Sequence, residues 1–243
     1  GGGMLFTFLA AQGKEIDDLL ENTVILLDPS FNPDGLQRFS TWANQHKSKN
    51  LVTDPNSREF NEVWPGGRFG HYWFDLNRDW VWQTQKETQQ RLKFYRSWMP
   101  MMHADFHEQS FQHSYYFPPA AKPYLNFIAQ STKDLQESVG RSFSKLFDEK
   151  KWSYFTSEVY DLLYPGYGDT YPVLNGAIGM TLDQGGIIGG LISAKSDGAT
   201  ISLVNRVKHH SALALNLVEW SLANSDALKT SFYGVHDKSR TMP

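Results

Sequence analysis

Three segments that we interpret as buried strands, each ending in or followed by polar side chains, constrain the fold of this chain more than any other feature. They occupy residues 23–27, 101–108 and 177–183, and segments with helical spacing separate them. The first run consists of β-branched residues and leucine without alternation, which is typical of a buried strand. Strands that alternate with helices predict an α/β fold in which functional residues gather where the strands end.

The helices that we expect flank this sheet. Periodic apolar residues predict helices at residues 4–11, 15–21, 84–98, 122–150 and 205–222, and residues 36–63 are predicted to form a long loop with one helical turn. We therefore expect a single domain over residues 1–243, with a mixed, mostly parallel central sheet flanked by helices. Because the chain begins inside an apolar segment without a capping residue, we also expect it to be N-terminally truncated.

Composition excludes several classes of function. Lys+Arg 23 against Asp+Glu 26 gives a net charge of -3 without a basic stripe, so we expect no nucleic-acid partner. The chain has no cysteine, which excludes disulfides, thiolate zinc sites and cysteine nucleophiles, so any metal must be bound by histidine and carboxylate side chains. The apolar runs are far too short to cross a bilayer, and we expect no membrane span.

Residues 64–80, WPGGRFGHYWFDLNRDW, concentrate charged side chains among aromatic rings. Arg68 and Arg78 offer forked donors that fit a carboxylate, and Asn77 adds an amide that could orient it. This pattern indicates a small anionic ligand. The alternative is structural: Arg78 and Asp79 cap a helix that begins near Trp80, and Arg68 stacks on aromatic faces.

Four motifs in one order resemble those of the zinc carboxypeptidase family. They are NPDG at residues 32–35, DLNR at 75–78 with Arg68 upstream, DFHE at 105–108, and Tyr164 followed by a strand that ends in an acid. The similarity covers about residues 24–190, which is most of the chain. It implies a carboxypeptidase-like fold and a zinc-dependent peptidase whose partner is a peptide or peptide-like substrate.

The resemblance implies roles for residues around the reacting carbonyl group. His107 matches the third zinc ligand of the family, and Asp183 falls where the family has its catalytic glutamate. Arg68 matches the arginine that polarises the scissile carbonyl and stabilises the oxyanion. Arg38 and Arg58 are alternative matches for this arginine, but their positions in the sequence fit less well.

Other residues match the part of the family's site that binds substrate. Asn77 and Arg78 match the pair that binds the free C-terminal carboxylate of the peptide. Tyr164 matches the mobile tyrosine that closes over substrate, with Tyr167 and Tyr171 as alternatives.

The chain departs from the family in its zinc ligands. The family's first two ligands lie in an HxxE motif upstream of NPDG, and no HxxE occurs in this sequence. One ligand cannot hold zinc, so we expect the other two ligands upstream of Gly1 and no catalytic zinc in the chain as given. His209 and His210 are adjacent on a predicted helix and point about 100° apart, so we do not expect them to chelate a metal.

Asp183 is a second departure, because the family has glutamate there. The shorter side chain reaches about an ångström less, and a displacement of that size can cost about a hundredfold in rate. Three interpretations remain open: the backbone compensates, Glu108 substitutes, or this member is weak or inactive.

The resemblance thus implies a zinc metallocarboxypeptidase that uses metal-activated water to remove C-terminal residues from peptides or cell-wall peptides. We expect the full-length protein to be active and the chain as given to be inactive. Such chemistry needs an activated water, a carboxylate base and cationic donors for the oxyanion. The alternatives are an inactive module of the same fold that binds peptide carboxylates, and a purely structural fragment. The resemblance implies a secreted or periplasmic location.

Overall fold

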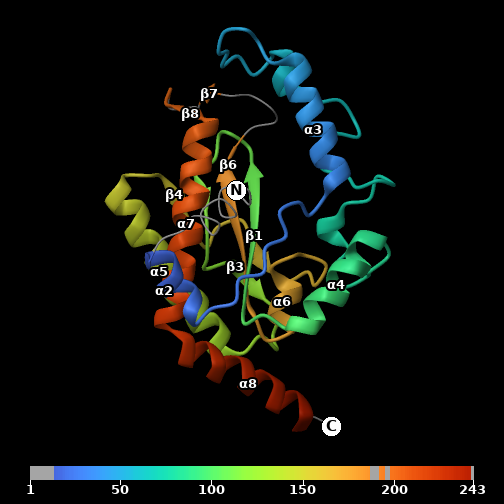
Figure 1. Ribbon diagram of the computed structural model, residues 1–243. Coiled ribbons are helices and arrows are strands. Elements are labelled where there is room, and N and C mark those ends of the chain that lie inside the picture. Colours follow the sequence, from blue (N-terminus) through green and yellow to red (C-terminus); the bar gives the residue numbers. More distant parts are fainter. Residues whose placement is uncertain (1–13, 187–191, 195–197, 242–243) are drawn as a thin grey trace.

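A computed structural model describes residues 14–186, 192–194 and 198–241 of the chain (Figure 1). The helix predicted at residues 4–11 lies outside these residues. The α-helices are α2 (Lys14–Glu21), α3 (Pro33–His46), α4 (Lys86–Trp98), α5 (Gln130–Lys150), α6 (Thr170–Leu174), α7 (Leu203–Ala223) and α8 (Ser225–Thr241). The strands are β1 (Met102–Gln109), β2 (Tyr115–Tyr116), β3 (Ala121–Tyr124), β4 (Tyr154–Phe155), β5 (Asp161–Leu162), β6 (Ile178–Gly185), β7 (Ile192–Ala194) and β8 (Thr200–Ser202).

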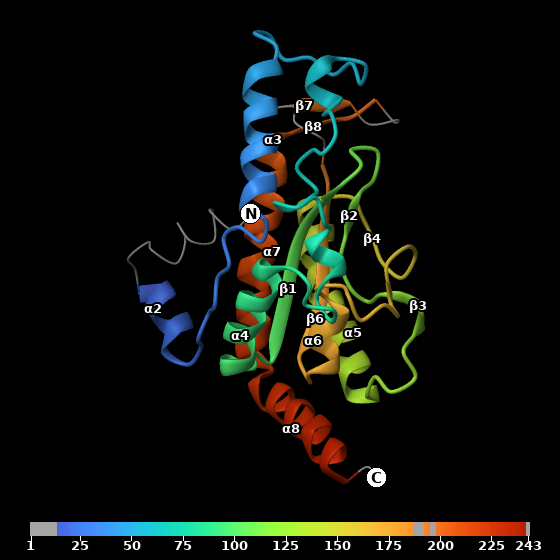
Figure 2. The same ribbon diagram turned by 90° about the vertical axis from the view of Figure 1, so that its right-hand side faces the viewer.

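The central sheet has the strand order β1-β6-β2-β4. Strand β1 is parallel to β6 and β2 is parallel to β4, whereas β2 is antiparallel to β6. Figure 1 shows α5 and α7 on one side of this sheet and α4 on the other, and Figure 2 shows the same arrangement from the side. The predicted α/β fold with a mixed, mostly parallel sheet flanked by helices is therefore confirmed. That residues 1–243 form one domain stays a prediction.

The two long strands separate the core from the polar face of the sheet. Phe106 is paired with Leu182 and His107 with Asp183, so neighbouring positions point to opposite faces. The face with Phe106 and Leu182 packs against α5 and α7. Its buried cluster consists of Tyr115, Phe117, Val139, Phe143, Phe147, Ile178, Met180, Leu182, Leu213, Trp220 and Leu228. The opposite face is left for the side chains of His107 and Asp183.

Several predicted elements are present in the structure. The strands at residues 101–108 and 177–183 correspond to β1 and β6, and the helices at 15–21, 84–98 and 205–222 correspond to α2, α4 and α7. The long helix begins later than expected, because residues Ala121–Tyr124 pair with β5 as strand β3 before α5 begins at Gln130. No helix among the described residues has both the length and the hydropathy needed to cross a bilayer.

The strand predicted at residues 23–27 is wrong. These residues have no regular secondary structure, and Val24 is 70% exposed. A strand is stable only when its backbone groups pair with a neighbouring strand, and residues 23–27 pair with none of the described strands. An apolar composition therefore did not suffice to place this segment in the sheet.

The long loop predicted at residues 36–63 is also corrected, because α3 (Pro33–His46) occupies its first part. The NPDG motif begins this helix: the Asn32 side chain accepts a hydrogen bond from the backbone N–H of Gly35 at 3.0 Å, and Pro33 follows at the first helical position. Asparagine caps and proline at the first position are both favourable at a helix start. The NPDG motif is thus a helix N-terminus.

Candidate active site

His107 and Asp183 lie side by side on neighbouring strands. Their Cα atoms are paired in the parallel ladder between β1 and β6, which places both side chains on the polar face of the sheet. Asp183 is buried, with 5% of its surface exposed, and His107 is partly buried. The sequence analysis predicted that the two residues share one site, and the strand register brings them together.

Asp105, two positions before His107 on β1, contacts the imidazole directly. Its Oδ2 atom lies 2.6 Å from Nε2 of His107. The side-chain amide nitrogen of Asn77 lies 3.1 Å from the same carboxylate oxygen and 2.9 Å from the same ring nitrogen. Sequence reasoning did not assign a role to Asp105, although its position on the same face of the strand as His107 was a usable signal.

The pKa values of this pair shift in opposite directions. Burial opposes ionisation of Asp105, but the charge and hydrogen bond of His107 outweigh it and hold the pKa of Asp105 below its ordinary value. Burial likewise opposes protonation of His107, but the charge and hydrogen bond of Asp105 raise the pKa of the imidazole above its ordinary value. The two groups therefore favour an ion pair.

Asp183 behaves differently. Burial raises the pKa of its carboxyl group above the ordinary value, against the opposing effects of a hydrogen bond from Tyr160 and the charge of His107. The Tyr160 hydroxyl donates to Oδ2 of Asp183 at 2.6 Å. Oδ1 of Asp183 is buried and has no hydrogen-bond partner among the described residues. A buried acid with a raised pKa and one unpaired oxygen is a suitable proton acceptor for chemistry at this face.

Arg68 lies at the edge of this group, 45% exposed at its side chain. Its Nε and a terminal nitrogen both lie 2.9 Å from Oδ2 of Asp75. The charge of Arg68 lowers the pKa of both Asp105 and His107, after the larger effects of burial and of their mutual contact. It is thus a cation close to the polar face, held by Asp75 in this structure.

Asn77 and Arg78, which follow each other in the short 3-10 helix Leu76–Arg78, point in different directions. Asn77 points to the sheet, and its Oδ1 accepts a hydrogen bond from the backbone N–H of Gly168 at 2.8 Å. Arg78 is exposed, and its guanidinium carbon lies 4.4 Å from the centre of the Tyr167 ring. Their shared role in binding a carboxylate stays a prediction.

Tyr164 lies away from Asp183 and is bonded to the segment that contains Arg78. Its hydroxyl accepts a hydrogen bond from Trp82 Nε1 at 2.7 Å and donates one to the backbone carbonyl of Arg78 at 3.1 Å. The tyrosine that contacts Asp183 is Tyr160, which no sequence motif singled out. Only the three-dimensional packing of the segment before β5 identifies it.

Two structural alternatives can now be judged. Asp79 does not cap a helix near Trp80; its carboxylate accepts hydrogen bonds from the backbone N–H groups of Thr84 and Gln85, each at 2.9 Å, in the segment just before α4. Arg68 forms an ion pair instead of stacking on an aromatic ring.

Glu108 does not substitute for Asp183. Neighbouring positions on a strand face opposite sides of the sheet, and Glu108 lies on the side of α7, where its Oε1 is 2.9 Å from Arg206. A carboxylate on that side cannot reach the face that holds His107 and Asp183. This interpretation of the aspartate at position 183 is therefore wrong.

The residues present do not fit a zinc ion by themselves. No group of three or more histidine, cysteine, aspartate and glutamate side chains in the described ranges could hold a metal. A protein zinc site needs at least about three protein ligands. His209 and His210 have other partners, Gln184 Oε1 at 2.6 Å and the Tyr115 hydroxyl at 2.7 Å.

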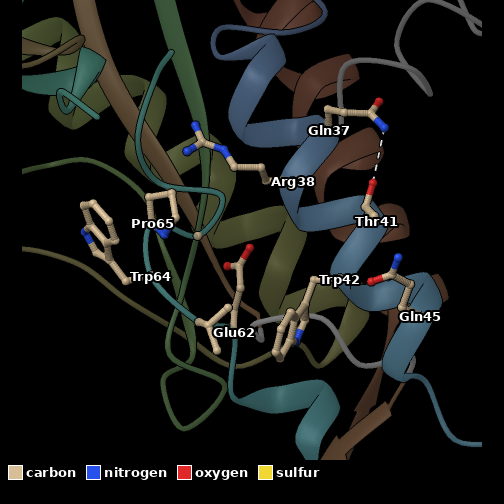
Figure 3. A pocket seen from close by; sticks show the side chains of 10 residues that line it. Gln37, Arg38, Thr41, Trp42, Gln45, Glu62, Trp64 and Pro65 are labelled. Atoms are coloured by element: carbon tan, nitrogen blue, oxygen red, sulfur yellow. Dashed lines mark hydrogen bonds between the residues drawn. The ribbon is translucent and has the colours of Figure 1, made fainter. Parts of the chain in front are cut away.

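A cavity of about 250 Å³ lies apart from this group, between α3 and residues 62–66 (Figure 3). Its walls include the rings of Trp42, Trp64 and Pro65, and the side chains of Gln37 and Thr41 are hydrogen-bonded to each other along α3 at 3.2 Å. The lining residues include Arg38, the less suitable alternative to Arg68, and none of the side chains that the sequence analysis preferred as catalytic, substrate-binding or metal-binding. The cavity therefore gives no support to any of those assignments.

A comparison with models of known protein families supports the resemblance. A family model described as zinc carboxypeptidase matches residues 4–178. Among solved structures, a metallo-carboxypeptidase from Burkholderia cenocepacia is similar at 14% identity with a TM-score of 0.48, over 69% of this chain and 42% of that one. The chain thus spans less than half the length of that structure. A comparison with curated proteins finds no significant match.

Proposed function

Because the chain belongs to the zinc carboxypeptidase family, we propose that it forms part of a metallocarboxypeptidase-like hydrolase that removes C-terminal residues from peptides or cell-wall peptides. The observation that supports this proposal is the pairing of His107 with Asp183 across β1 and β6. A basic imidazole and a buried acid with an unpaired oxygen lie together on the polar face, and Arg68 lies close by.

Each residue has a role in this proposal that its surroundings suit. Oδ1 of Asp183 accepts a proton from the attacking water, because this oxygen has no other partner among the described residues and burial raises the pKa of the carboxyl group, which makes it a stronger base. Arg68 leaves Asp75 to stabilise the negative charge that develops on the carbonyl oxygen. Arg78, with Asn77, binds the C-terminal carboxylate of the peptide, and Tyr164 closes over the substrate.

Zinc is expected in the complete protein, since its family is zinc-dependent. His107 is the one imidazole that we assign to that ion, and further ligands from outside the described residues must complete the site. A secreted or periplasmic location is part of the same proposal, and fractionation of the producing cells tests it.

The carboxylate-binding part of the proposal can be tested on the chain of 243 residues. Calorimetry compares short peptides that have a free C-terminal carboxylate with the same peptides amidated at that end. We expect binding only of the free acids, and a loss of about tenfold or more in affinity for Arg78→Ala, because a charge-assisted hydrogen bond is removed. Arg141→Ala, at an exposed arginine of α5, is the matched control and should bind as the original chain does.

The hydrolytic part requires a longer form of the protein with zinc added, assayed for release of the C-terminal residue. Release that disappears in Asp183→Ala supports the enzyme, and the absence of zinc uptake by the longer form would exclude it. Binding of free acids without release, together with activity in Asp183→Glu, would instead support the alternative, an inactive carboxylate-binding module. Equal binding of free acids and amides would reject both.

A further inference from the structure

Three polar atoms meet at the ring of His107. The distances are 2.6 Å between Asp105 Oδ2 and His107 Nε2, 2.9 Å between Asn77 Nδ2 and the same ring nitrogen, and 3.1 Å between Asn77 Nδ2 and Asp105 Oδ2. In such a triangle the position of each proton decides which contacts attract and which repel. The surroundings of Asn77 allow those positions to be assigned.

The orientation of the Asn77 amide is fixed from its far end. The backbone N–H of Gly168 donates to Oδ1 of Asn77 at 2.8 Å, and a backbone N–H can only donate. The oxygen of the amide must therefore face Gly168, and the NH₂ group must face Asp105 and His107. This settles the choice between amide oxygen and nitrogen by hydrogen bonding, which is how such assignments are made.

The proton on the imidazole follows by elimination. An ionised carboxylate only accepts hydrogen bonds, so a contact of 2.6 Å between Oδ2 of Asp105 and Nε2 of His107 is attractive only if Nε2 has the proton. A ring nitrogen that has a proton cannot accept a hydrogen bond. The NH₂ group of Asn77 therefore donates its hydrogen bond to Asp105 and not to His107. When the ring is neutral, its lone pair is then on Nδ1.

Gly168 is the residue that permits this close packing. A Cβ atom at position 168 would lie 2.5 Å from Oδ2 of Asp105 and 3.0 Å from Oδ1 of Asn77. The first distance is too short for two non-bonded atoms, so any side chain at this position would displace the carboxylate from the imidazole. The chain of contacts thus runs from Gly168 through Asn77 and Asp105 to His107.

We propose that Asp105 is a positioning residue for His107: supported by Asn77 and Gly168, it fixes the ring orientation and keeps the ring proton on Nε2, leaving Nδ1 as the basic atom. Carboxylates that accept the second N–H of a functional histidine fix its tautomer in this way. The inference goes beyond the proposed function, which needs His107 but gives Asp105 no role. In this structure both ends of the Asn77 amide are hydrogen-bonded, to Gly168 and to Asp105, so Asn77 supports the ring and must release Asp105 before it can bind a substrate carboxylate.

The test is nitrogen NMR of the chain labelled with ¹⁵N-histidine, recorded at a pH above that at which His107 loses its charge. Long-range proton-nitrogen correlations identify which ring nitrogen has the proton, and the missing signal in His107→Gln assigns the residue. We expect the Nε2–H form of His107 to exceed the Nδ1–H form by about tenfold or more, since the hydrogen bond is to a charged group. A predominant Nδ1–H form would overturn the proposal, whatever the enzymatic activity.

Two variants separate positioning from general packing. Asp105→Ala removes the acceptor of the Nε2–H group, so the excess of the Nε2–H form of His107 should fall. Asp169→Asn is the control, because Asp169 is also buried on this side of the sheet but accepts hydrogen bonds from Thr170 and Thr181, and it should leave the His107 signals unchanged. An unchanged excess of the Nε2–H form in folded Asp105→Ala would refute the role of Asp105. If that variant fails to fold, the measurement on the original chain still decides.

Discussion

Replacing Asp183 by asparagine should stabilise the folded chain at neutral pH, although the residue is the proposed proton acceptor. In the folded state this carboxyl group is buried, its pKa is raised by that burial, and its Oδ1 has no hydrogen-bond partner among the described residues. Leaving a buried polar group unpaired costs about 1 to 3 kcal/mol, and more when the group is charged. An uncharged amide of the same shape avoids the cost of the charge.

The sign of the pH dependence follows from the raised pKa. A carboxyl group whose pKa is higher in the folded than in the unfolded state favours folding below the unfolded pKa of about 3.9, and this contribution is lost as the pH rises through the folded pKa. We therefore expect the free energy of unfolding of Asp183→Asn at pH 7 to exceed that of the original chain by about 1.4 kcal/mol for each unit by which burial raises the folded pKa, because the amide has no charge to bury. The difference should shrink as the pH falls toward about 4.

Urea denaturation followed by tryptophan fluorescence at several pH values measures this difference. Asp17→Asn is the matched control, because Asp17 is exposed on α2, and it should show little difference at any pH. A variant less stable than the original chain at pH 7, or a difference that does not change with pH, would refute the reasoning. Either result would mean that Asp183 is stabilised as a charged group by its neighbours.

Two further changes test the surroundings of the site. Asp79→Ala leaves the backbone N–H groups of Thr84 and Gln85 without their acceptor and should lower the free energy of unfolding by about 1 to 3 kcal/mol at pH 7. Burial opposes ionisation of Asp79, but its hydrogen bonds outweigh burial and lower the pKa of the carboxyl group. The loss of stability in Asp79→Ala should therefore disappear as the pH falls through this lowered pKa. A loss that persists in acid would contradict the role of the ionised carboxylate. Gly168→Ala forces a Cβ atom against Asp105 and should lower the free energy of unfolding, measured by urea denaturation, by about 1 to 3 kcal/mol. Gly234→Ala is the control and should cause no such loss, because a Cβ atom there meets open space.

The sequence predicted the parts of the fold that depend on local pattern. Apolar periodicity located α4 and α7, and the runs before His107 and Asp183 located β1 and β6. The same reasoning failed at residues 23–27, which have a strand-like composition but pair with no described strand. It also predicted a long loop at residues 36–63, although the asparagine and proline of NPDG begin a helix there, α3.

The candidate site shows the same division. Motif order selected His107, Arg68, Asn77, Arg78 and Asp183, and the strand register then placed His107 beside Asp183. The partners of these residues were not predictable. Tyr160 contacts Asp183 across a gap of 23 positions, in a segment without any motif.

The sequence by itself determined which residue types are available and which face of each long strand is apolar, because alternation along a strand is a local property. Only the tertiary structure decided that Asn77 lies in contact with Asp105, His107 and Gly168, from which it is separated by 28, 30 and 91 positions. Hydrogen bonds between distant segments depend on how whole elements pack, and the spacing of residues along one element does not contain that information.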